Sequence, residues 1–158
     1  MNPTTKLKMK WNVILALLTA TLLLTSGVVL AKSIDCTGGP CVGTQKPDQL
    51  IGTEGDDEIV GRGGKDIIIG DPAEGWGDDL IRGGDGDDSI TDNFAGEDVD
   101  TIFAGKGDDV INVRERRAGD FGADVIDCGP GKDTVIIDVA VFEASDTISS
   151  NCEIVNPS

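Results

Sequence analysis

The stretch GTEGDDEIVGRGGKDIII, residues 52–69, begins a run in which one nine-residue phrase occurs eight times. Most of the phrases are rich in glycine, and each has Asp at its sixth position and Ile or Val at its eighth. The copies are GTEGDDEIV (52–60), GRGGKDIII (61–69), EGWGDDLIR (74–82), GGDGDDSIT (83–91), AGEDVDTIF (95–103), AGKGDDVIN (104–112), GDFGADVID (119–127) and CGPGKDTVI (128–136). Turn chemistry alone explains single Gly–Asp pairs but needs no fixed phase, so the pattern predicts a repeat architecture.

The sixth-position aspartates are candidate metal ligands. Glycines at the first, second and fourth positions permit tight turns whose carbonyls point inward. Calcium takes roughly six to eight oxygen ligands, which main-chain carbonyls and Asp carboxylates can supply. The sequence therefore predicts calcium as the cofactor, bound by Asp57, Asp66, Asp79, Asp88, Asp100, Asp109, Asp124 and Asp133.

The eighth position holds the one obligatory hydrophobic residue of each phrase. The residues are Ile59, Ile68, Ile81, Ile90, Ile102, Ile111, Ile126 and Val135. In a short strand after the Asp, this side chain points inward while its neighbours point outward. A nine-residue unit cannot bury one isoleucine alone, so the units must stack, and this short period is typical of a parallel β-helix.

With these phrases, the chain resembles the RTX (repeats-in-toxin, hemolysin-type) family, whose consensus is GGxGxDxUx with U a large apolar residue. The phrase GGDGDDSIT (83–91) matches every letter of that consensus. The resemblance implies an all-β fold, a right-handed parallel β-roll (β-solenoid) in which two nonapeptides make one coil, so that eight phrases give about four coils. It also implies that calcium lies between adjacent loops on the same edge and is shared by their Asp carboxylates.

The spacing of the phrases separates two sets of loops. Successive sixth-position aspartates are 9, 13, 9, 12, 9, 15 and 9 residues apart, and the extra residues (70–73, 92–94 and 113–118) all precede odd-numbered copies. If copies alternate between two edges, every insertion lies on one edge. We expect three stacked calcium sites on the regular edge, and three more on the other edge if the insertions leave its loops together. The regular set is Asp66, Asp88, Asp109 and Asp133, and the other set is Asp57, Asp79, Asp100 and Asp124.

Two features of the phrases bear on which aspartates are ligands. In AGEDVDTIF (95–103), Asp98 replaces the fourth-position glycine, which makes Asp100 the weakest of the predicted ligands. Several phrases carry a second Asp at the fifth position, where the family's loop points outward, and we interpret these residues as surface charge: Asp56, Asp78, Asp87 and Asp108. An EF-hand is not indicated, because no segment has its Asp and Glu spacing.

The amino terminus has the order of a secretory signal. Lys6, Lys8 and Lys10 precede an apolar run over 13–24, and small or tolerated residues end at Ala31. We expect cleavage after Ala31 and a secreted, extracellular protein; an uncleaved membrane anchor is the alternative. The resulting organisation is a signal peptide (1–31), an amino-terminal cap or leader (32–51), the repeats (52–136) and a carboxy-terminal cap (137–158).

Four cysteines follow the expected cleavage site, which fits an oxidising compartment. Cys36 and Cys41 bracket a Thr-Gly-Gly-Pro turn, whereas Cys128 opens the last phrase and Cys152 lies in the tail. We predict the bridges Cys36–Cys41 and Cys128–Cys152, although four cysteines permit three connectivities. Together with the segments CGPGKD (128–133) and NCE (151–153), the chain resembles small secreted calcium-binding proteins of bacteria.

Charge links calcium to folding. After Ala31 there are ten basic and twenty-nine acidic residues, a net charge of −19. Low hydrophobicity with high net charge is the signature of a disordered chain. Six bound calcium ions would leave a net charge of about −7, so we expect binding and folding to be one event.

Catalysis is the main competing class of function. The chain has no histidine, no tyrosine and no G-x-S-x-G motif, which removes most nucleophilic and imidazole mechanisms and leaves a carboxylate-based enzyme as the weaker alternative. An extracellular adhesin or assembly module is the other alternative, with Arg114, Arg116 and Arg117 as a basic cluster for a cell-surface or cell-wall polymer. Net charge disfavours nucleic acid, and no segment after Ala31 favours membrane insertion.

Overall fold

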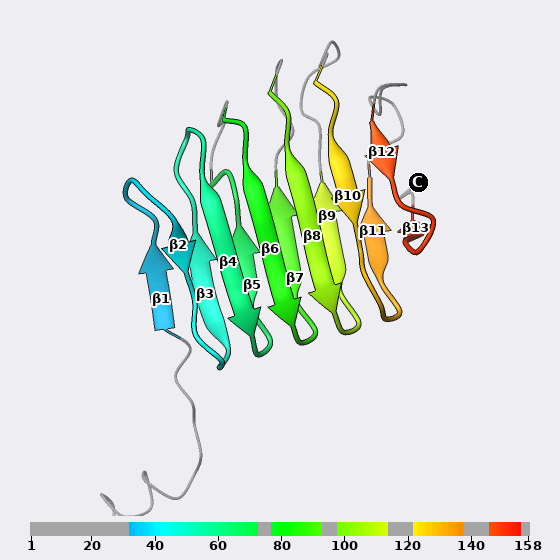
Figure 1. Ribbon diagram of the computed structural model, residues 1–158, viewed down its shortest axis with the longest axis horizontal. Coiled ribbons are helices and arrows are strands. Elements are labelled where there is room, and N and C mark those ends of the chain that lie inside the picture. Colours follow the sequence, from blue (N-terminus) through cyan, green and yellow to red (C-terminus); the bar gives the residue numbers. More distant parts are fainter. Residues whose placement is uncertain (1–31, 73–76, 93–97, 114–121, 138–145, 156–158) are drawn as a thin grey trace, which may run out of the picture. The chain divides into compact units, whose positions relative to one another are not determined.

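The computed structural model describes residues 32–72, 77–92, 98–113, 122–137 and 146–155, which contain β-strands and no helix. The predicted signal segment and the three clustered arginines lie outside these residues. Two parallel sheets face each other, one with seven strands in the order β1-β3-β5-β7-β9-β11-β13 and one with six in the order β12-β10-β8-β6-β4-β2 (Figure 1). None of the described segments contains a helix with the length and hydropathy needed to span a bilayer.

Consecutive strands alternate between the sheets, so each pair forms one coil. The seven-stranded sheet contains β1 (Lys32–Asp35), β3 (Asp48–Ile51), β5 (Ile67–Ile69), β7 (Ser89–Asp92), β9 (Val110–Val113), β11 (Thr134–Ile136) and β13 (Glu153–Val155). The six-stranded sheet contains β2 (Cys41–Val42), β4 (Glu58–Gly63), β6 (Leu80–Asp85), β8 (Thr101–Lys106), β10 (Val125–Asp127) and β12 (Thr147–Ile148). The predicted β-roll is confirmed. The eight phrases supply β4 to β11, which make four coils, and the remaining strands extend the stack at both ends.

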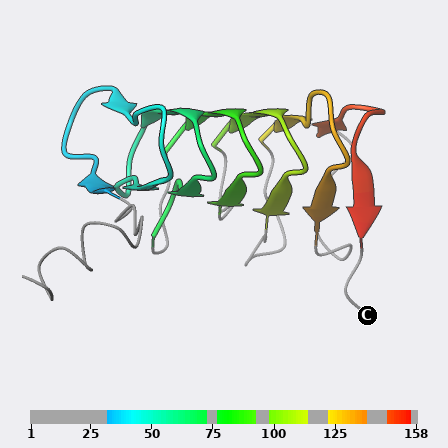
Figure 2. The same cartoon turned by 90° about the horizontal axis from the view of Figure 1, so that it is seen from below.

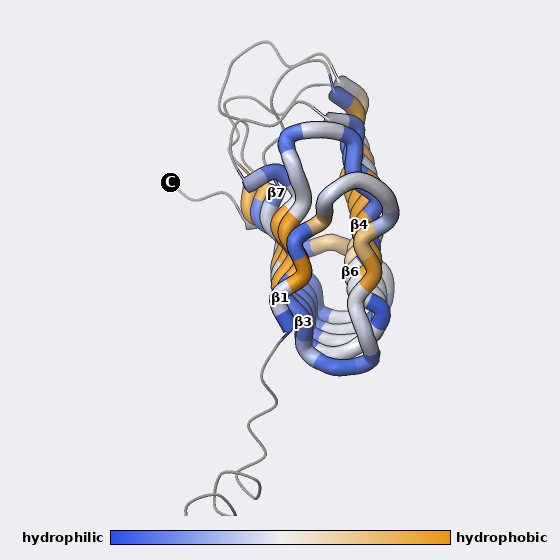
Figure 3. The backbone as a smooth tube through the Cα atoms, turned by 90° about the vertical axis from the view of Figure 1, so that its left-hand side faces the viewer, coloured by the Kyte–Doolittle hydropathy of each residue, from blue (hydrophilic) through white to orange (hydrophobic). Residues whose placement is uncertain are grey.

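The core is a double row of eighth-position residues. Ile59, Ile81 and Ile102 are register partners in one sheet, and Ile68 and Ile90 are partners in the other. All eight predicted residues are at most 1% exposed. The end-on view shows hydrophobic segments on both walls of the stack (Figure 3). One buried Ile contributes roughly 1.5–3 kcal/mol to folding, which is too little to stabilise a coil on its own. Each coil is therefore stabilised mainly by its contacts with neighbouring coils.

The coils turn at two different edges. We call the edge with the short loops β2–β3, β4–β5, β6–β7, β8–β9 and β10–β11 the regular edge. The opposite edge carries β3–β4, β5–β6, β7–β8, β9–β10 and β11–β12, and we call it the inserted edge (Figures 1 and 2). Every extra segment between phrases connects strands across the inserted edge, as the spacing predicts.

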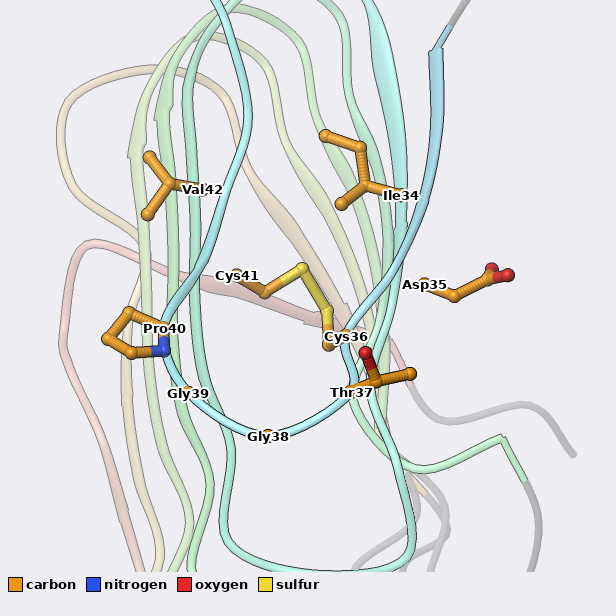
Figure 4. Close-up of a pocket in the computed structure, with 9 residues that line it drawn as sticks. All are labelled: Ile34, Asp35, Cys36, Thr37, Gly38, Gly39, Pro40, Cys41 and Val42. Carbon is orange, nitrogen blue, oxygen red and sulfur yellow. A yellow bond between two sulfur atoms is a disulfide. The ribbon is translucent and has the colours of Figure 1, made fainter.

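Disulfides close both ends of the stack. Cys36 is bonded to Cys41 and Cys128 to Cys152, which confirms the predicted pairing. Because Thr134 is the register partner of Glu153, Cys152 stands where the regular edge would place its next sixth-position residue. The other bridge lines an open pocket formed by residues 34–42, in which Asp35 is the charged residue (Figure 4). The bridges therefore mark where the Asp loops begin and end.

Candidate calcium sites

The sixth-position aspartates form two hydrogen-bonded ladders, one along each edge. In each ladder the backbone N–H of one Asp donates to the Oδ1 atom of the Asp one coil further along. On the regular edge the N···Oδ1 distances are 2.8 Å (Asp66 to Asp88), 2.7 Å (Asp88 to Asp109) and 2.9 Å (Asp109 to Asp133). On the inserted edge they are 3.0 Å (Asp57 to Asp79), 2.8 Å (Asp79 to Asp100) and 2.8 Å (Asp100 to Asp124). The structure thus brings all eight predicted residues into two stacks.

The ladders are longer than the eight phrases. The N–H of Asp48 donates to Oδ1 of Asp66 at 2.8 Å, and the N–H of Asp124 donates to Oδ1 of Asp146 at 3.1 Å. Both new residues are followed two positions later by an apolar residue, Leu50 or Ile148. These two segments lack the full glycine pattern of the repeat, but the Asp and the apolar residue at the same spacing identify them as degenerate copies.

The second carboxylate oxygen is the notable part of each ladder residue. It is buried and has no hydrogen-bond partner at Asp66, Asp79, Asp88, Asp109 and Asp133. A buried carboxylate oxygen without a partner is costly, and a bound cation would remove that cost. These atoms are therefore an observation of the structure that fits a metal ion.

Main-chain carbonyls lie beside these oxygens. A Cβ atom placed on Gly61 would lie 2.5 Å from Oδ2 of Asp66 and would collide with the carbonyl oxygen of Gly83. A Cβ atom on Gly83 would likewise lie 2.6 Å from Oδ2 of Asp88 and collide with the carbonyl of Ala104. Both of these first-position glycines thus keep space open between a carboxylate and a carbonyl. Such hard oxygen donors suit calcium.

The first coil differs from the later ones because threonine residues donate hydrogen bonds to its ladder aspartates. Oδ2 of Asp48 accepts hydrogen bonds from the N–H (2.6 Å) and Oγ1 (2.8 Å) of Thr44. Oδ2 of Asp57 accepts the same pair from Thr53, at 2.6 Å and 2.9 Å. Thr occupies the second position of both loops, where the consensus has glycine. Asp57 remains a predicted ligand, but its Oδ2 atom already accepts two hydrogen bonds, unlike Oδ2 of Asp79 in the next coil.

The stacked carboxylates also repel one another. Burial, with repulsion from neighbouring aspartates, raises the pKa of Asp88 to about 7 and that of Asp109 to about 6. On the inserted edge, burial and the charge of Asp92 raise the pKa of Asp79 to about 8 and that of Asp100 to about 10. Burial and mutual repulsion thus favour the protonated form of these four carboxylates. A calcium ion would favour the charged carboxylates instead.

The inserted edge is more acidic than its phrases predict. Asp100, the weakest predicted ligand, is 1% exposed and lies within the ladder, and Asp98 is 7% exposed. Asp71, Asp79 and Asp92 each offer one carboxylate oxygen, and these atoms all lie within 4.8 Å of one another. Sequence reasoning missed Asp71 and Asp92, whose one signal is that each follows the strand segment of a phrase at the start of an insertion.

The fifth-position aspartates have a role beyond surface charge. They are exposed, as predicted. Oδ1 of Asp56 accepts the N–H of Asp78 at 3.1 Å, and Oδ1 of Asp78 accepts the N–H of Val99 at 2.8 Å. Oδ1 of Asp87 likewise accepts the N–H of Asp108 at 3.1 Å. These residues therefore form an outer ladder that hydrogen-bonds one coil to the next.

Fold and site together define a parallel β-roll whose edges are stacked Gly–Asp loops of the calcium-binding type. The family model of the RTX calcium-binding nonapeptide repeat (4 copies) matches residues 42–72, 75–93 and 94–113. The matched segments are RTX repeats, and RTX nonapeptide repeats bind calcium. The match begins early enough to include the degenerate copy around Asp48. Neither the comparison with curated proteins nor the comparison with solved structures gives a match.

Proposed function

We propose that this is a secreted, non-catalytic calcium-binding protein whose β-roll folds when calcium ions bind between its stacked loops. The proposed ligands are the sixth-position carboxylates, Asp57, Asp66, Asp79, Asp88, Asp100, Asp109, Asp124 and Asp133, together with loop carbonyls. The observation that carries the proposal is that Oδ2 is buried and has no hydrogen-bond partner at five of these residues, namely Asp66, Asp79, Asp88, Asp109 and Asp133.

Coupled folding follows from the electrostatics of the ladders. Successive carboxylates of one edge are held together by N–H···Oδ1 bonds, as between Asp88 and Asp109. Their charges and their burial oppose folding, and the core supplies about one buried Ile or Val per phrase. A cation between adjacent loops converts the repulsion into attraction, so the metal's binding free energy contributes directly to folding.

Circular dichroism tests the binding and folding parts of the proposal. The far-ultraviolet spectrum of the purified protein should be disordered in chelator and become β-rich during a calcium titration, with magnesium at matched ionic strength giving little change. The Asp88→Asn variant should need more calcium, because an amide oxygen has no charge and replaces a buried carboxylate oxygen. A spectrum that is already β-rich in chelator at pH 8, or that magnesium restores equally, would overturn coupled, calcium-specific folding.

Secretion needs a separate test. The protein should be recovered from the culture medium of an expressing bacterium, with an amino terminus that begins at Lys32 on Edman sequencing. A chain that stays with the membrane fraction and keeps its first residues would support the uncleaved anchor instead. The caps on either side of the repeats, residues 32–51 and 137–158, belong to the same proposed mature protein.

A further inference from the structure

Three buried carboxylates meet on the inserted edge outside the repeat consensus. Asp92 is the last residue of β7, Asp71 lies two residues after β5, and Asp79 directly precedes β6. Their exposed fractions are 0%, 2% and 2%. One carboxylate oxygen from each lies within 4.8 Å of the other two. Two oxygens on one calcium ion, at about 2.3–2.6 Å each, are at most about 5 Å apart, so this cluster fits a single ion.

Asp79 directs an available oxygen into the cluster. Its Oδ1 atom accepts the N–H of Asp57 at 3.0 Å, whereas its Oδ2 atom is buried and has no hydrogen-bond partner. A Cβ atom on Gly70 would lie 2.9 Å from that Oδ2 and 2.5 Å from Oδ1 of Asp92. The two carboxylates therefore converge beside Gly70, and the missing side chain leaves the space between them open.

Register explains how residues outside the phrases reach this place. Ile69 pairs with Thr91, so Gly70 lies level with Asp92 in neighbouring coils. The N–H of Gly70 donates to the carbonyl of Thr91 at 3.0 Å, as the N–H of Gly52 donates to the carbonyl of Ile69 at 2.8 Å. Asp92 thus occupies the first loop position, where the regular edge has a glycine such as Gly83. At this point a carboxylate replaces a glycine.

We propose that Asp71, Asp79 and Asp92 form a carboxylate-rich calcium site that joins the β5–β6 and β7–β8 loops. Asp79 is the ligand that this site shares with the Asp ladder, and Asp71 and Asp92 are supplied by the insertions. The proposal rests on the proposed function, because it assumes that the roll binds calcium. Since calcium affinity rises with the number of charged ligands in a site, this site should fill at lower calcium than those of the regular edge.

The test is a count of bound ions. The double variant Asp71→Asn with Asp92→Asn leaves every sixth-position Asp intact. After equilibrium dialysis against calcium, elemental analysis should find one ion fewer per chain than in the unmodified protein, and the tightest phase of a calorimetric titration should be lost. The matched control is Asp56→Asn with Asp87→Asn, which removes the same charge from the outer ladder while the amide oxygen still accepts the hydrogen bond. The control should keep the full number of ions.

The outcomes separate this inference from the proposed function. If the unmodified protein binds no calcium, the proposed function fails and this site fails with it. If it binds calcium and the double variant binds the same number with the same affinities, only the inference is overturned, and the cluster is a set of buried acids sharing protons. Should the double variant not fold in calcium, Gly70→Ala decides, because its Cβ would intrude between Asp79 and Asp92. Loss of one ion supports the site, and a full complement overturns it.

Discussion

On the regular edge, the loops after β4, β6 and β8 close within a few residues, whereas the loops after β5 and β7 on the inserted edge are longer. The regular loops place a buried Asp oxygen beside a main-chain carbonyl of the next coil, as at Asp66 with Gly83 and at Asp88 with Ala104. The inserted loops instead add buried carboxylates, Asp71 and Asp92, around Asp79. The two edges therefore gather oxygen donors by different means.

The comparison shows what loop length contributes. A short loop must use backbone carbonyls, and carbonyls point inward only if the chain adopts conformations that favour glycine. A longer loop has room to bring in side chains, which carry charge but need no special backbone geometry. The repeat consensus describes the first kind of loop. Substitutions that disturb backbone conformation should therefore destabilise the regular edge most. Substitutions that remove a charge should instead have effects that differ from one coil to another.

The largest effect is expected for Gly86→Ala on the regular edge. Gly86 has φ of 141°, and an added Cβ atom would collide with the carbonyl oxygen of Gly64 in the preceding coil. Backbone strain and overpacking together should lower the free energy of unfolding by about 3 kcal/mol or more. Urea unfolding in saturating calcium measures this loss.

Gly55→Ala is the matched control, because Gly55 holds the same fourth position in the first loop of the inserted edge. An added Cβ atom there meets no atom within 4 Å. The change should stay within about 0.5 kcal/mol. Equal losses for both variants would mean that glycine acts through general chain flexibility and not through close contact between coils.

The next effect compares Asp88 with Asp57. Oδ2 of Asp88 has no hydrogen-bond partner, whereas Oδ2 of Asp57 accepts two hydrogen bonds from Thr53. Asp88→Asn should raise the calcium concentration at the folding midpoint by about tenfold or more, which corresponds to about 1.4 kcal/mol. Asp57→Asn should raise it less. Calorimetry at constant pH measures both shifts, and Asp87→Asn serves as a control for the loss of one exposed charge.

A shift at Asp57 as large as that at Asp88 would contradict the distinction between the threonine-capped first coil and the coils that follow. It would mean that Thr53 releases the carboxylate when calcium binds. The variant Thr53→Gly, which restores the consensus residue and removes the hydroxyl donor, would then be expected to bind calcium more tightly than the unmodified protein.

Much of this architecture follows from one-dimensional spacing. The fixed distance from Asp to Ile predicts which residues are buried, and the alternation of spacings predicts the two edges. The pairing of Cys128 with Cys152 is favoured by their places at the last phrase and the tail, although four cysteines permit three connectivities. These features depend on the local sequence, or on a stack whose neighbours are set by the repeat itself.

Other features depend on stacking that the phrases do not describe. Asp71 and Asp92 are far apart in sequence and belong to no phrase, and only the pairing of β5 with β7 brings them beside Asp79. The extra ladder residues Asp48 and Asp146 were missed because their phrases lack the full glycine pattern. The hydrogen bonds from Thr44 and Thr53 to Oδ2 of the ladder aspartates also could not be predicted, because they depend on the direction of each carboxylate oxygen.

The stability of the calcium-free roll should depend on pH in a way that is unusual for carboxylates. Burial raises the pKa of Asp88 to about 7 and that of Asp109 to about 6, from an ordinary value of 3.8. The folded, calcium-free roll therefore binds more protons than the unfolded chain. The resulting stability is complete below about pH 4 and is lost as the pH rises through 6 and 7.

Calcium-depleted protein should consequently show more β-structure at pH 5 than at pH 8, and calcium affinity should increase over the same interval because each ion displaces protons. Circular dichroism after exhaustive dialysis, followed by calcium titration at each pH, measures both trends. Stability of the calcium-free protein that increases with pH would contradict the assignment of raised pKa values to the ladders.

The smallest effect is expected for Arg62→Gly, which tests backbone strain on the regular edge. Arg62 has φ of 79°, and the second position of the later regular loops is occupied by Gly84, Gly105 and Gly129, which also have positive φ. For a residue with a Cβ atom this conformation costs about 1–2 kcal/mol, and glycine avoids that cost while losing somewhat more entropy on folding. Arg62→Gly should therefore stabilise the calcium-bound roll by about 1 kcal/mol or less in urea unfolding.

Lys65→Gly provides the control for this last variant, because it removes a positive charge from the same loop at a position without positive φ. It should be neutral or destabilising, since glycine there adds chain entropy without relieving strain. If Arg62→Gly also destabilises, the arginine contributes more through its charge on this acidic edge than its backbone conformation costs. The regular edge would then depend on charge as the inserted edge does, and the contrast between the two would be one of degree.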